Sequence, residues 1–417
     1  MRIRSLVQTT AIASLLVAVP VAAQEVPSTV TLEQAVSLFH GVSPELRRAR
    51  NRLRASIGTA QQSRAMLNPT ASLTNEDLGA YSERYFTLSQ GMDFVWNRGG
   101  KGRRAEARNG ESRAMFLADS AQIVFGLKRA FVDAWETSEE VSALSETDRV
   151  VAAALEDAAQ RYAAGDLAGY DLRRLRVARA TLGRRLASAE LSLEDAERRL
   201  GSLLASDGSI PRVRPQALQI EAPGVSPTLD PVDRALAVRP ELAAAMWMTQ
   251  ALDAEADLVR RSFLTGTALT GGYKQQSDGR NGLFLGIELP IPILDRRAGA
   301  VDAAVAEVDR AESEVALTRL GIARDAALAD ARLASARRQQ QIMGGDGMEE
   351  ASALLDIARV AYGEGEVGIV ELVDAADAFL EARLLESTAR AELWLAYFAF
   401  EHAVGGFPGG ATNGETR

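Results

Sequence analysis

The sequence predicts a mainly α-helical protein with a small β part, built from two copies of one strand–strand–long-helix unit. Proline is absent between Pro69 and Pro211 and again between Pro292 and Pro408, and both intervals are rich in Ala, Leu, Arg and Glu, the strong helix formers. Alternating apolar and polar residues mark a hairpin in each half. The two halves also share landmarks, which indicates a duplication.

These landmarks recur in the same order at a nearly constant offset. They are SPEL at 43–46 and RPEL at 239–242 (offset 196), WNR at 96–98 and LDR at 294–296 (offset 198), and YAAG at 162–165 and YGEG at 362–365 (offset 200). A period of about 200 residues is far longer than that of an ordinary solenoid repeat. The chain is therefore predicted to be a tandem duplication.

Composition excludes several classes of protein. The 417 residues include no Cys and only two histidines, His40 and His402, which argues against disulfide scaffolds, thiol enzymes and Cys- or His-rich metal centres. The formal charge of −9 argues against nucleic acid as the main partner. No nucleophile elbow, metal-ligand spacing or cofactor fingerprint appears, so we expect neither an enzyme nor a bound cofactor.

The N-terminus resembles an export signal. Arg2 and Arg4 precede an apolar segment, and small residues before Gln24 form a cleavage site, so residues 1–23 are predicted to be a signal peptide. The mature charge would be 45 minus 56, or −11. No Cys follows the cleavage site to carry a lipid anchor, and no run of 18 apolar residues predicts a membrane-spanning helix.

The remaining chain divides into two repeats, a connector and a tail. The first repeat (24–205) opens with a helix over 32–66, followed by strands at about 70–78 and 85–96 and helices over 99–162 and 170–205. The second (232–406) has strands at about 265–274 and 282–291 and helices over 297–362 and 367–404, with a break expected at the glycines of 344–347. The Pro-rich stretch 206–231 is the connector, and 407–417 is a flexible tail.

The sequence leaves open how the strands bury their apolar faces and how such long helices pack. Each hairpin has one apolar face, and four strands cannot close a barrel alone. They form either a small internal sheet on the helices or part of a barrel pooled from several copies. A helix over 99–162 would span roughly 95 to 100 Å, which favours coiled-coil packing.

Tyr362-x-x-Gly365 leading into IVELVDA at 369–375, within this duplicated architecture, resembles the TolC-like outer-membrane efflux proteins. The resemblance implies a homotrimer whose 12-stranded β-barrel spans the outer membrane and continues as a periplasmic α-helical coiled-coil barrel, with the connector in the equatorial region. Its implied partners are outer-membrane lipid, a periplasmic adaptor (membrane fusion) protein and an inner-membrane pump of the resistance-nodulation-division type. The implied function is the exit duct of a tripartite efflux system.

The family's gate lies at the helix-to-helix turns of the periplasmic tip. Carried over by position, the tip turns contain Tyr162, Gly165, Tyr362 and Gly365, and the pore constriction contains Glu371, Asp374, Asp171 and Arg174. The acids could equally be solvated residues in the first turn of a helix. Val367 replaces an arginine that the family uses in closing, and our hypothesis is that Arg174 pairs instead with Glu371 or Asp374.

Residues 88–101 and 289–296 resemble the CzcC-like branch, which is associated with heavy-metal efflux. This branch implies no metal site in the duct itself. A drug-efflux or type I secretion duct would share the same architecture, and the sequence does not identify the substrate or the pump. A periplasmic coiled-coil adaptor or scaffold is the other candidate, although it would not explain the two hairpins.

Overall fold

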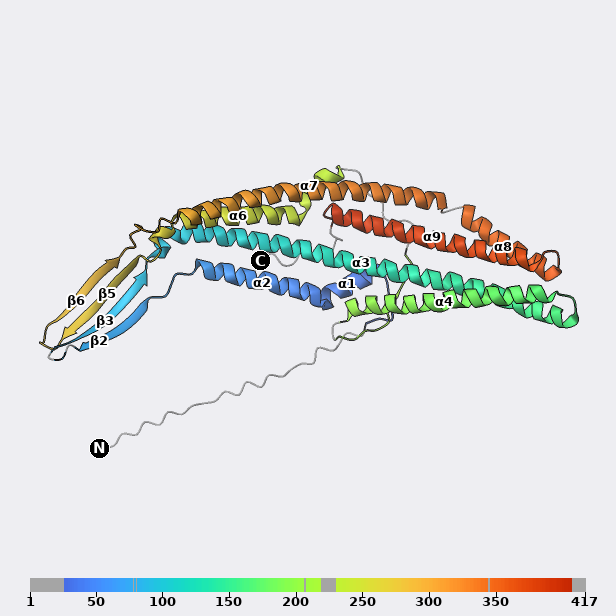
Figure 1. The fold of residues 1–417 in the computed structure, drawn as a ribbon, viewed down its shortest axis with the longest axis horizontal. Helices are drawn as coiled ribbons and strands as arrows, with labels where there is room; N and C mark the ends of the chain where they lie inside the picture. The colour runs from blue at the N-terminus through green and yellow to red at the C-terminus, as the bar shows by residue number, and fades with distance from the viewer. Residues whose placement is uncertain are drawn as a thin grey trace, which may run out of the picture.

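The computed structural model describes residues 26–77, 79, 81–205, 208–218, 230–343 and 346–406 of the chain. The expected signal peptide and C-terminal tail lie outside these residues, and so does half of the expected connector. The described chain is long and narrow, with a sheet at one end and helices running away from it (Figure 1).

The elements follow each other in the same order in both halves. They are β1 (Thr29–Val30), α1 (Leu32–Val42), α2 (Pro44–Arg64), β2 (Thr70–Asp77), β3 (Ser82–Gly91), α3 (Asp93–Ala164), α4 (Gly169–Leu204), β4 (Arg214–Pro215), α5 (Pro231–Val238), α6 (Pro240–Arg260), a 3-10 turn (Ser262–Leu264), β5 (Ala268–Gln276), β6 (Asn281–Glu288), α7 (Ala298–Met343), α8 (Asp346–Glu364) and α9 (Ile369–Ala403).

The four long strands form one antiparallel sheet in the order β2-β3-β5-β6. Its register aligns Leu73, Phe86, Tyr273 and Leu283 in one row across all four strands. Directly opposed residues share a face of the sheet, and these four side chains are 43 to 87% exposed. The sheet projects beyond the helices (Figure 1), so the alternative of an internal sheet packed on the helices is wrong.

Two predicted elements needed correction. The strand expected at 85–96 is 82–91, and the helix expected from 99 already begins at Asp93, whose carboxylate accepts hydrogen bonds from the side chains of Asn97 and Lys101 in the next turns. The helix expected over 32–66 is two helices. Ser43 caps the second one by accepting a hydrogen bond from the Leu46 N–H at 3.3 Å, and Pro44 occupies its first position.

The long helices form a layer whose order differs at its two ends. Near the sheet, α2 packs against α3, α3 against α6, and α6 against α7. Far from the sheet, α4 packs against α3, α3 against α9, and α9 against α8. The α3 helix is common to both ends and has 72 residues, or roughly 108 Å at about 1.5 Å per residue. The second long segment is divided into α7 and α8.

Candidate functional site

The two helix turns farthest from the sheet have the same backbone geometry. Gly165 ends α3 with φ of 87°, and Gly365 ends α8 with φ of 79°. The Gly165 N–H donates to the Tyr162 carbonyl, and the Gly365 N–H donates to the Tyr362 carbonyl, both at 3.1 Å. Glycine adopts this left-handed conformation without steric cost, which explains why it recurs in both turns.

The two tip tyrosines have different surroundings. Tyr162 is 50% exposed, whereas Tyr362 is only 6% exposed. Within the described residues the buried Tyr362 hydroxyl has no hydrogen-bond partner. Burial, followed by the negative charges of Asp157 and Asp171, raises the pKa of the Tyr362 phenol above its ordinary value. Inside one chain, Tyr362 is therefore a packing residue.

Arg161 joins the two turns and was not singled out in the sequence. Its guanidinium donates to the Gly363 carbonyl at 2.8 Å, lies over the Tyr362 ring at 5.2 Å, and forms an ion pair with Asp157 at 2.8 Å. The equivalent position in the second repeat is Ala361. This asymmetry within an otherwise duplicated motif is the signal that could have identified Arg161.

The predicted gate acids lie at the start of the helices that lead away from the turns. Glu371 and Asp374 are exposed in the first turns of α9, and Asp171 is half-buried in the first turn of α4. Asp377 and Glu381 continue the acidic face of α9 at spacings of three and four residues. The sequence analysis missed these last two acids.

Asp377, one turn beyond Asp374 on α9, has a shifted pKa. Its pKa is raised, first by burial and then by the negative charge of Asp374, while Arg185 on α4 acts in the opposite direction. Arg174 is half-buried and forms no ion pair within the described residues of one chain. The hypothesised pair with Glu371 or Asp374 is therefore not an intrachain contact.

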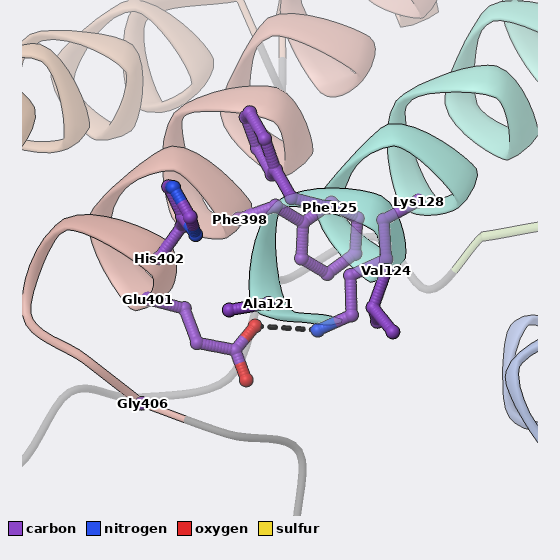
Figure 2. A pocket seen from close by; sticks show the side chains of 8 residues that line it. All are labelled: Ala121, Val124, Phe125, Lys128, Phe398, Glu401, His402 and Gly406. Atoms are coloured by element: carbon purple, nitrogen blue, oxygen red, sulfur yellow. Dashed lines mark hydrogen bonds and ion pairs between the residues drawn. The ribbon is translucent and has the colours of Figure 1, made fainter. Parts of the chain in front are cut away.

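A second cluster of charged and aromatic side chains joins α3 to α9 closer to the middle of the molecule (Figure 2). Lys128 and Glu401 form an ion pair at 2.6 Å, and their side chains are 8% and 19% exposed. The Lys128 ammonium also lies over the Phe398 ring at 4.8 Å, and Phe125 stacks on His402 at 5.1 Å. The enclosed space has room for about one water molecule, so the cluster is a structural junction.

The His402 imidazole predicts a pH dependence of stability. Burial, followed by the positive charge of Arg239, lowers its pKa. Below about pH 6.5 the unfolded chain therefore binds more protons than the folded chain. The contribution of the neutral imidazole to the free energy of unfolding is fully present above that pH and is lost as the pH falls. We expect His402→Phe, which keeps the stack on Phe125, to reduce the loss of thermal midpoint between about pH 7.5 and about pH 5. An unchanged loss would contradict this assignment.

Neither a metal centre nor a helical membrane span is found among the described residues. No three or more His, Asp or Glu side chains there are grouped closely enough to hold a metal ion. None of the helices in the same part of the chain combines the length and apolar character needed to cross a lipid bilayer.

Comparison with known proteins identifies the family. Residues 232–406 match the model of the family described as "Outer membrane efflux protein". The cobalt-zinc-cadmium resistance protein CzcC of Cupriavidus metallidurans is 25% identical over 386 residues, which cover 88% of each chain. Residues 232–406 are therefore an outer membrane efflux protein region, and the similarity to CzcC extends over most of the chain. Proteins of this family are channels, so the chain is not an enzyme.

A second relative and two solved structures are similar to this chain in the same way. The nickel-cobalt-cadmium resistance protein NccC of Alcaligenes xylosoxydans xylosoxydans is 26% identical over 316 residues, 72% of this chain and 68% of that protein. The CmeC outer membrane channel of Campylobacter jejuni has a TM-score of 0.75 at 16% identity, covering 90% of this chain and 85% of that one. CusC has a TM-score of 0.73 at 17% identity, with 90% and 92% covered. These two structures confirm the TolC-like fold.

Proposed function

We propose that this outer membrane efflux protein is the exit duct of a tripartite efflux system that removes heavy-metal cations. The match to CzcC over 88% of both chains supports heavy-metal cations as the substrate, because that relative is named for cobalt, zinc and cadmium resistance. Three copies would each contribute one four-stranded sheet to a 12-stranded outer-membrane barrel, with the long helices forming a periplasmic tunnel. A periplasmic adaptor and an inner-membrane pump of the resistance-nodulation-division type would deliver the cations.

The exposed sheet supports this proposal. Its row of Leu73, Phe86, Tyr273 and Leu283 is apolar and largely exposed, and its outer strands β2 and β6 each leave one edge unpaired. A lipid environment would satisfy the side chains, and neighbouring copies would satisfy the backbone edges. Residues 1–23, as a signal peptide, would direct the chain across the inner membrane.

Fractionation and metal tolerance together test the function. We expect the chain to remain in the outer-membrane fraction after a high-salt wash, and its deletion to sensitise cells to Co²⁺, Zn²⁺ or Cd²⁺. Release as a soluble periplasmic protein would refute the duct. Sensitisation to organic compounds without any change in metal tolerance would refute the substrate class.

The gate proposal makes a separate prediction about ion selectivity. Symmetry copies of Glu371 and Asp374 around a narrow axis would attract cations and repel anions. We expect the Glu371→Gln, Asp374→Asn double variant to reduce the cation-to-anion permeability ratio several-fold in planar bilayers. Glu190→Gln, which removes an exposed carboxylate from the body of α4, is the control and should leave the ratio unchanged.

Arg174 is tested by charge reversal. If it pairs with Glu371 or Asp374 of a neighbouring copy, Arg174→Glu should increase basal leakage through the duct. Unchanged leakage would eliminate that pair without affecting the selectivity prediction.

A further inference from the structure

We propose that the junction between the sheet and the helices binds the headgroup of an anionic phospholipid. Two exposed arginines, Arg98 and Arg261, would hold the phosphate, and the exposed apolar residues Val95 and Phe263 beside them would contact the acyl chains. This inference rests on the proposed outer-membrane duct and names the class of lipid that its periplasmic end takes.

The junction is cationic, although the chain as a whole is anionic. It consists of the segments next to the four strand ends on the helical side of the sheet (Figure 1), namely residues 64–67, 91–103, 257–267 and 288–297. These segments contain eight basic and four acidic residues, so their formal charge is 8 minus 4, or +4, whereas the whole chain carries −9. The junction therefore attracts anions that the rest of the molecule repels.

The surface of the junction is also rich in apolar side chains. Val95 is 52% exposed at the start of α3, Phe263 is 44% exposed in the 3-10 turn, and Leu294 is fully exposed between β6 and α7. Exposed apolar side chains interleaved with arginines are typical of a surface at the boundary between lipid headgroups and acyl chains.

The position of the junction along the sheet matches the boundary of a bilayer. The four strands have 8 to 10 residues each, and a tilted strand of about 9 to 11 residues crosses a membrane. In the proposed duct, the free end of the sheet would face the outside of the cell and the helices would extend into the periplasm. The junction would then lie among the headgroups of the inner leaflet.

Arg98 and Arg261 have charges that no acid of the chain neutralises. Both are exposed, and neither pairs with a carboxylate in the part of the chain that the structure describes. Asp93 and Asp257, the two acids of the same segments, are already paired with other basic side chains. Both guanidinium groups are therefore available to an anionic ligand.

Two hydrogen bonds hold the segments of these arginines side by side. The Met92 N–H donates to the Thr267 carbonyl at 2.8 Å, and the Arg261 guanidinium donates to the Trp96 carbonyl at 3.3 Å. The second bond places the Arg261 head group two residues from Arg98 and leaves most of its N–H groups free. Guanidinium groups bind phosphate oxygens through paired N–H donors, so this patch suits a phosphate.

Neighbouring copies would leave this pair of arginines uncovered. The pair lies next to β3 and β5, the two inner strands of the sheet, whereas further strands can add only at the free edges of β2 and β6. Lipid is therefore the partner that reaches the pair in the proposed duct.

The charge of the pair favours an anionic lipid over a zwitterionic one. Phosphatidylglycerol carries one uncompensated negative charge and cardiolipin carries two, whereas the guanidinium groups would repel the ammonium group of phosphatidylethanolamine. Each arginine near an anionic lipid surface changes the affinity roughly fivefold. Two arginines therefore suffice for a clear preference.

Lipid binding by the full-length chain tests the site. The purified and delipidated chain in detergent is titrated with phosphatidylglycerol and, separately, with phosphatidylethanolamine, and bound lipid is counted by native mass measurement. We expect Arg98→Gln to weaken the binding of phosphatidylglycerol roughly fivefold, and the double variant Arg98→Gln, Arg261→Gln about tenfold or more, with phosphatidylethanolamine unaffected. Within the described residues the Arg98 side chain makes no hydrogen bond or ion pair, so the single variant breaks none.

The double variant Arg173→Gln, Arg176→Gln is the matched control. It removes the same charge from exposed positions of α4, far from the sheet (Figure 1), and should leave both affinities unchanged. Millimolar inorganic phosphate, added at constant ionic strength, should not displace phosphatidylglycerol. Displacement would indicate a site for free phosphate and would refute the lipid.

The remaining outcomes separate the lipid site from the duct. If the chain stays in the outer membrane but the wild type and the arginine double variant bind phosphatidylglycerol equally well, the site is wrong while the duct stands. A wild type that binds the two lipids equally would refute the preference for anionic headgroups. If the chain is released as a soluble periplasmic protein and binds neither lipid, the duct and the site both fail.

Discussion

Replacing Lys128 with alanine is expected to lower the free energy of unfolding by about 3 kcal/mol or more, which makes it one of the two most damaging single changes that we predict. The Lys128 ammonium is almost fully buried against Glu401 and the Phe398 ring. Its removal would leave the Glu401 carboxylate uncompensated in a largely apolar junction between α3 and α9. Denaturant unfolding followed by circular dichroism measures the effect.

The partner residue provides the control. In the double variant Lys128→Met, Glu401→Leu, no charge is left without a partner, and replacing a buried ion pair with apolar side chains is often neutral. We expect the double variant to regain most of the stability that Lys128→Ala loses. If the two variants were equally destabilised, the loss would come from packing alone, and the electrostatic explanation would be refuted.

The second large effect is expected at Gly201, near the end of α4. A Cβ atom added there would lie 1.8 Å from the carbonyl oxygen of Pro211, a backbone atom that cannot move aside as a side chain can. We expect Gly201→Ala to destabilise the chain by about 2 to 4 kcal/mol, because the segment around Pro211 must be displaced from α4. The thermal midpoint of unfolding would fall accordingly.

Gly183 lies on the same helix, and its replacement with alanine is expected to change stability in the opposite direction. No atom lies within 4 Å of a Cβ added there, apart from the helix's own backbone and chain neighbours. Gly183→Ala should therefore stabilise the chain by about 0.5 to 1 kcal/mol, through the lower helix propensity of glycine alone. A similar loss at both positions would show that the crowding at Gly201 is not the cause.

The sequence revealed those parts of the fold that depend on local pattern. Period-two alternation located the hairpins, and the duplicated glycines at 165 and 365 located both tip turns. In the first half, the alternation of apolar and polar residues continues beyond the end of the strand, so the predicted strand was too long. Met92, Phe94 and Trp96 are spaced like strand residues, but the chain is helical from Asp93, whose carboxylate accepts hydrogen bonds from the side chains of Asn97 and Lys101 further along the helix. A pattern of residue types does not reveal such side-chain contacts.

The candidate site was predictable only as far as the family's motif could be carried over. Glu371 and Asp374 were predicted from their position after the second turn in that motif. Arg161 was not, because its importance comes from a contact with Gly363, 202 residues away in the sequence. Asp377 and Glu381 were missed for another reason, since only the observed exposure of α9 shows that the acidic face continues beyond the first turns.

The unpaired edges of β2 and β6 have a consequence for how the protein is made. The helices can satisfy their own backbone groups in water, whereas a solitary sheet presents two rows of free amides and carbonyls beside an apolar row of side chains. Such edges can form hydrogen bonds with an exposed strand of any other chain. If the chain is exported and assembles as proposed, the interval between these two steps would be the stage at which it is most prone to aggregate, and at which a chaperone that shields strands would protect it most.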